Sequence, residues 1–132
     1  MDKEKKTRLW FHYSSIYRKV LTHVLDWPAK RIEHCIEELR QQMEAEVGDP
    51  DTHGFFFDPP SGHIWRAIVG DLYDKAKGNE AGPYPVYQRL EAAISGGLNH
   101  WDMDKESFDW NQARQRYQEE RRRIEEWLAT LD

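Results

Sequence analysis

The stretch that decides the fold of this chain is "WNQARQRYQEERRRIEEWLATL", residues 110–131. Its apolar side chains recur at intervals of three, four or seven residues, and mostly charged or amide side chains stand between them. Because an α-helix turns once every 3.6 residues, side chains at these intervals line one face. The pattern predicts a helix over about residues 107–130 whose buried stripe contains Trp110, Ala113, Tyr117, Ile124, Trp127, Leu128 and Leu131.

The same helical spacing continues toward the N-terminus. It predicts further helices over about residues 4–25, 28–47, 62–77 and 85–95. Asp26 or Trp27 is the expected cap of the second helix, with Pro28 in its first turn, and Ser61 is the expected cap of the third. The expected core side chains of these four helices are Leu9, Tyr13, Ile16, Tyr17, Val20, Val24, Ile32, Cys35, Ile36, Leu39, Met43, Ile64, Trp65, Ile68, Leu72, Ala76, Tyr87, Leu90 and Ile94.

These elements predict an all-α fold. The expected architecture is a single-domain bundle of about five helices over residues 1–132, with long first and last helices and an aromatic and proline-rich loop between the second and third. Alternating Val, Ile or Thr runs and Asn-Gly or Asp-Gly hairpin signals are missing from the sequence, so strands are not expected.

Composition narrows the class of protein. A net charge of −5 argues against a dedicated nucleic-acid binder, which usually concentrates basic side chains on one face. The sequence shows neither a secretory signal nor an apolar run long enough to cross a membrane, so a cytoplasmic protein is expected. It also lacks a P-loop, a nucleophile elbow and a His-Glu-x-x-His pair. Cys35, on an apolar face, is interpreted as a core residue, and no cofactor is predicted.

The stretch "GFFFDPPSGHIW", residues 54–65, places three consecutive aromatic rings in a predicted loop. Phe55, Phe56 and Phe57 cannot all face one core, because they alternate in an extended chain and spread around a helical turn. Either they fill gaps between helix ends, or they form an exposed anchor for a partner. In the second interpretation they make a contact patch with the neighbouring acids Asp51 and Asp58, and Trp101 and Trp110 are second choices.

Two constellations could support chemistry instead. His53, Asp58 and His63 flank the aromatic rings and could contribute to a divalent metal site, although their spacing matches no known motif. His12 and His23 lie eleven residues apart, three turns along one side of the first helix. Glu120 interrupts the stripe of the last helix and needs a partner, for which Arg121, a histidine or a tyrosine is available. A Glu120–His23 pair would be an acid/base couple.

The sequence therefore favours a small helical protein that acts by binding another protein or a second copy of itself. An interaction module, an inhibitor or immunity-type partner, or a subunit of a larger complex fits this description. A third option is an acidic protein that occupies a nucleic-acid groove as a mimic, which predicts salt-sensitive binding to a basic partner. The alternative is a small helical hydrolase or nuclease that uses His12, His23 and Glu120, or the histidine and aspartate cluster with a divalent ion.

Overall fold

The computed structural model describes residues 3–45, 62–78 and 82–131. These residues form seven α-helices and one π-helix and contain no strand, so the all-α prediction is confirmed. Contacts divide the chain into two compact units, Met1–Ile64 and Trp65–Asp132. The single domain expected from the sequence stays a prediction. No helix in the described ranges has the length and apolar character needed to cross a membrane.

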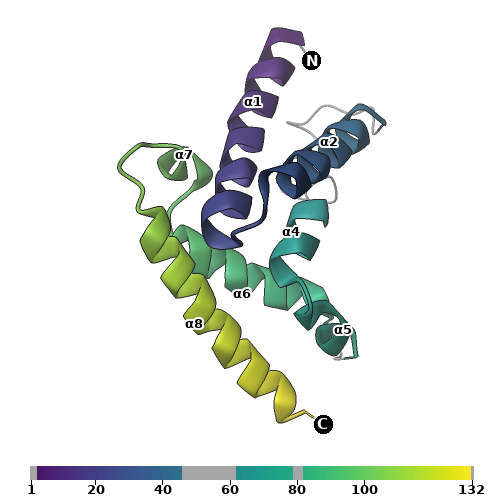
Figure 1. Cartoon of the computed structure of the whole chain (residues 1–132), viewed down its shortest axis with the longest axis vertical. Coiled ribbons are helices and arrows are strands. Elements are labelled where there is room, and N and C mark those ends of the chain that lie inside the picture. Colours follow the sequence, from purple (N-terminus) through teal and green to yellow (C-terminus); the bar gives the residue numbers. More distant parts are fainter. Residues whose placement is uncertain (1–2, 46–61, 79–81, 132) are drawn as a thin grey trace. The chain divides into compact units, whose positions relative to one another are not determined.

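The first unit contains α1 (Lys3–Lys19), the π-helix η1 (Val20–Val24) and α2 (Ala29–Ala45). The predicted first helix is therefore helical to Val24, but its last turn is a π-turn, in which the Leu25 amide donates to the Val20 carbonyl at 3.1 Å. The chain then turns back at Asp26, whose φ is 57°, and α2 begins beside α1 (Figure 1). The side chains buried here are Tyr13, Ile16, Val20, Leu21, Val24, Ile32, Cys35, Ile36 and Leu39.

α4 (Gly62–Val69) crosses the boundary between the units and is followed by α5 (Leu72–Lys77). The prediction of one continuous helix over residues 62–77 is wrong at Gly70. The φ of Gly70 is +59°, a left-handed conformation that ends a right-handed helix. The sequence contained a signal for this break, because glycine favours the left-handed conformation at a helix end and the polar Asp71 follows Gly70.

The second unit is built mainly on α6 (Pro83–Ser95) and α8 (Trp110–Ala129), which pack more extensively than any other pair of described helices. Between them the chain forms the short helix α7 (His100–Met103), visible in Figure 1 in the connection from α6 to α8. The helices α5, α6 and α8 bury Leu72, Ala76, Val86, Tyr87, Leu90, Ile94, Ala113, Tyr117, Ile124 and Leu128.

The predicted stripe of the last helix is buried only in its centre. Ala113, Tyr117, Ile124 and Leu128 are buried, as expected. Leu131 and, to a lesser degree, Trp127 are exposed, so their assignment to the core is wrong. Trp127 lies one position before Leu128, about 100° around the helix. Leu131 lies two residues beyond Ala129, the last residue of α8.

Candidate functional site

The aromatic contact patch predicted from the sequence lies outside the described residues. Phe55, Phe56, Phe57, Asp51 and Asp58 all fall between α2 and α4, in residues 46–61. Their role as a partner-binding patch stays a prediction.

The possible metal site is largely outside the described residues too. His53 and Asp58 fall in the same range, whereas the backbone of His63 belongs to α4. Within residues 3–45, 62–78 and 82–131, no group of three or more His, Cys, Asp or Glu residues is placed to hold a metal ion.

The two histidines proposed for acid/base chemistry belong to the first unit. His12 is half-buried on α1, and its ring meets that of Tyr13 edge-on with 5.1 Å between the centroids. His23 is exposed in the π-helix. On α2, His34 pairs with Glu38 at 3.0 Å across one helical turn, and burial raises the pKa of the Cys35 thiol. A thiol shifted in this direction is a poor nucleophile at neutral pH.

Glu120, the third residue of that hypothesis, belongs to the second unit and has partners there. Its carboxylate accepts hydrogen bonds from Arg89 Nε at 2.8 Å, and it lies 3.4 Å from Arg123 Nη1. The Glu120 side chain is only 18% exposed, so the contact with Arg89 joins α6 to α8 in a partly shielded place. The guanidinium carbon of Arg89 also lies 5.8 Å from the centre of the Trp127 ring. These contacts make Glu120 part of a structural ion pair.

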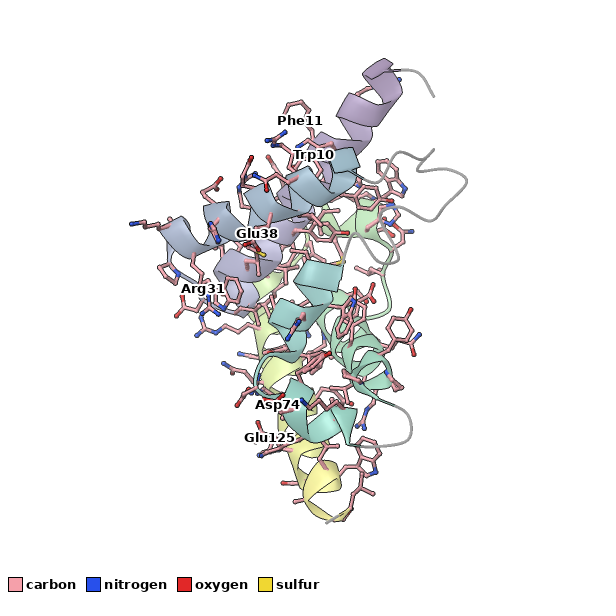
Figure 2. All side chains as sticks on the ribbon, turned by 90° about the vertical axis from the view of Figure 1, so that its right-hand side faces the viewer. Trp10, Phe11, Arg31, Glu38, Asp74 and Glu125 are labelled. Atoms are coloured by element: carbon pink, nitrogen blue, oxygen red, sulfur yellow. The ribbon has the colours of Figure 1, made fainter. Side chains whose placement is uncertain are left out.

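Arg121, which the sequence offered as a partner for Glu120, makes a different set of contacts. It pairs with Asp71 and Glu125, and its Nη1 donates to the Tyr117 hydroxyl at 3.1 Å. That hydroxyl in turn donates to the Ile68 carbonyl at 2.8 Å. Arg121 and Tyr117 therefore tie α8 to the turn between α4 and α5. Figure 2 labels Glu125 on α8 and Asp74 on α5. It also labels Arg31 and Glu38 of the first unit.

The largest exposed apolar side chains of the second unit include two in the connection between α6 and α8. Leu98 is 49% exposed and Trp101 is 55% exposed. We call this pair the Trp101 surface. The sequence suggested Trp101 only as a second choice and did not single out Leu98. The position of Leu98, directly after the Gly96-Gly97 break of α6, was the signal in the sequence for its exposure, because α6 does not continue there to bury this side chain.

Backbone contacts hold the Trp101 surface in a defined conformation. Gly96 and Gly97 have φ values of 63° and 85°, and the Gly96 amide donates to the Ala92 carbonyl at 2.9 Å. The Asn99 side chain then caps α7 by accepting a hydrogen bond from the Asp102 amide at 3.0 Å. At the other end Asp109 caps α8 through the Gln112 amide, also at 3.0 Å. Hydrogen bonds of the caps therefore hold the backbone on either side of Trp101.

Aromatic neighbours distinguish the two second-choice tryptophans. Trp101 has the His100 ring beside it, with 5.0 Å between the centroids, and most of its own surface stays open to solvent. Trp110, the first residue of α8, is half-buried and meets the Phe108 ring edge-on at 4.7 Å. Of the two, Trp101 leaves more of its ring open to solvent.

Comparisons of the chain with protein-family models, with curated proteins and with solved structures find no match. The proposals below therefore depend on the residues alone.

Proposed function

We propose that this protein acts by binding another protein, and that the Trp101 surface is a point of contact. The observation that carries the proposal is the 55% exposure of Trp101 on a connection closed by helix caps at both ends. An exposed indole is costly to leave in water and is among the side chains most often found at the energetic centre of protein interfaces. A capped connection presents it with little entropy left to lose.

The predicted patch at Phe55–Phe57 is compatible with this function and is a second proposed contact. It would supply the same kind of anchor, an aromatic side chain next to a carboxylate. The support for it comes from the sequence alone, whereas the support for Trp101 also comes from its exposure and its neighbours.

The hydrolase or nuclease alternative is less well supported. A general base must present a free carboxylate or imidazole to its substrate, and the carboxylate of Glu120 contacts two arginines. Native mass spectrometry of the tagged protein, drawn gently from its own cells, compares the two hypotheses. A bound metal or small molecule on a lone monomer would favour the enzyme, and a stoichiometric second protein would favour binding.

The variant Trp101→Ala tests the contact itself. We expect a loss of partner binding of about 30-fold or more, which corresponds to about 2 kcal/mol for a central aromatic anchor. Trp127→Ala is the matched control, because Trp127 is a less exposed tryptophan of the same unit, at 37%. The proposal fails for this surface if both variants retain the same partner with unchanged affinity. Phe56→Ala, measured in the same assay, tests the predicted second contact.

A further inference from the structure

Trp27 and Arg31 form a stacked pair where α2 begins, and Figure 2 labels Arg31. The guanidinium carbon of Arg31 lies 3.7 Å from the centre of the Trp27 ring, which is closer than the 4.6 Å between Arg66 and the Tyr73 ring. At this distance the guanidinium rests on the ring. Its N–H groups lie in its own plane, so a ring beneath one face leaves them available to a ligand.

Hydrogen bonds of the turn before α2 hold the backbone of both residues. The Trp27 amide donates to the Leu21 carbonyl at 3.0 Å, and the Arg31 amide donates to the Pro28 carbonyl at 3.0 Å. Trp27 is half-buried, whereas Arg31 is exposed. The indole therefore supports the guanidinium from below and leaves it accessible from outside.

The Arg31 side chain has no anionic partner in the described part of the chain. It makes neither an ion pair nor a hydrogen bond there, and the first turn of α2 contains no acid. The acids farther along α2 have other partners: Glu33 contacts Arg18, Glu37 contacts Arg40 and Glu38 contacts His34. The neighbouring Lys30 is exposed and also makes no ion pair with a described residue. The positive charge of Arg31 and Lys30 is therefore not compensated by an ion pair.

Helix stability does not explain this position of Arg31. The dipole of a helix is positive at its N-terminus, so a cation in the first turn is slightly unfavourable. Arg66 differs in this respect, because it lies in the last turn of α4, where a cation is favourable.

We propose that Arg31 and Trp27 bind a carboxylate of a partner protein and that Lys30 adds to the attraction. Two N–H groups of a guanidinium match the two oxygens of a carboxylate, and the indole keeps them in one orientation. The net charge of −5 disfavours a nucleic acid as the ligand, because a polyanion is repelled by the chain as a whole. This site belongs to the first unit and does not involve the Trp101 surface.

A nuclear magnetic resonance titration of the full chain with a hexaglutamate peptide tests the site. We expect saturable shifts of the Trp27 indole N–H and Arg31 Nε–H signals. Arg31→Gln should weaken binding by about tenfold. Arg31→Lys should weaken it too, because lysine retains the charge but does not offer two N–H groups in one plane. Arg66→Gln is the matched control, since it removes the same charge from an arginine over an aromatic ring and should leave binding unchanged.

Three results would overturn the proposal. The first is no shift of either signal at millimolar peptide, and the second is equal weakening by Arg31→Gln and Arg66→Gln, which would show that only net charge matters. The third is tighter binding of inorganic phosphate than of the peptide, which would make phosphate the ligand. Trp101→Ala should bind the peptide like the parent protein, so failure at this site and failure of the Trp101 surface remain distinguishable.

Discussion

At Gly96, α6 ends in a conformation that lets the Arg116 side chain of α8 reach the last turn of α6. The Gly96 φ of 63° is left-handed, and the missing side chain leaves room for Arg116. Arg116 Nε donates to the Ala93 carbonyl at 2.7 Å, and Nη2 donates to the Ile94 carbonyl at 3.0 Å. These are among the carbonyls that lose their helical partners where α6 ends. A side chain from a neighbouring helix therefore completes the C-terminus of α6.

Replacement of Gly96 by alanine should lower the free energy of unfolding by about 1–3 kcal/mol. An added Cβ would lie 2.8 Å from Arg116 Nη2, and alanine is strained at a positive φ. Urea unfolding measures the loss. Gly78→Ala is the control, since Gly78 has a φ of −77° and the nearest atom would lie 3.8 Å away. Equal stability of the two variants would show that neither strain nor the Arg116 contact matters at Gly96.

Ionisation of Tyr117 should lower the free energy of unfolding at alkaline pH. Burial, and secondarily the charge of Glu125, raises the pKa of its hydroxyl to about 12, from about 10 in the unfolded chain. Below about pH 10 the hydroxyl is protonated in both states, so its contribution is fully present. Between about pH 10 and 12 the unfolded chain releases this proton first, and up to about 3 kcal/mol of stability is lost.

The variant Tyr117→Phe should reduce this dependence and should also be less stable at neutral pH by about 1–3 kcal/mol, because the Ile68 carbonyl loses its buried donor. Denaturant unfolding at several pH values measures both effects. Tyr84→Phe, which removes the hydroxyl of an exposed tyrosine, should change stability at neutral pH by less than about 0.5 kcal/mol. If the free energy of unfolding of Tyr117→Phe fell with pH in parallel with that of the parent protein, the pH dependence would not come from Tyr117.

At the scale of elements, α6 and α8 are joined by apolar packing and by a polar contact at its edge. The side chains Val86, Leu90 and Ile94 of α6 are buried, as are Ala113 and Tyr117 of α8. Arg89 and Glu120 add a hydrogen-bonded ion pair with a shortest distance of 2.7 Å. Because Glu120 is largely shielded, this pair should contribute more than the exposed contact between Arg18 and Glu33 in the first unit.

A double-mutant cycle on Arg89 and Glu120 should give a coupling energy of about 1 kcal/mol or more. The same cycle on Arg18 and Glu33, whose side chains are 43% and 60% exposed, should give about 0–1 kcal/mol despite good geometry at 2.8 Å. Both energies come from chemical denaturation of the single and double variants. A larger coupling energy for Arg18 and Glu33 than for Arg89 and Glu120 would contradict the expectation that the more buried pair is the stronger one.

The whole molecule has two compact units of similar length, with the boundary between Ile64 and Trp65. Each unit has its own buried side chains, which include Leu21 in the first and Leu90 in the second. Units of about 65 residues bury only about 60% of the surface of their unfolded chains, so each would be marginally stable alone.

We therefore expect the chain to unfold in one cooperative transition, as the sequence-based prediction of a single domain requires. Tryptophan fluorescence and far-ultraviolet circular dichroism, recorded against urea, should give coincident curves. The tryptophans Trp10 and Trp27 report from the first unit, and Trp65, Trp101, Trp110 and Trp127 report from the second. Two separated transitions would show independent domains.

The sequence by itself determined the all-α class, most helix positions and the central core side chains of each helix. It did so because helix periodicity and the chemistry of proline, glycine and caps act within a few residues: α2 follows Pro28, and α6 ends at Gly96. Only the tertiary structure decided the partners of Glu120 and the exposure of Trp101. Arg89 lies 31 residues from Glu120, and whether an apolar side chain is covered depends on which helix stands beside it. Those outcomes depend on distances between elements, which the spacing of residues along one helix does not contain.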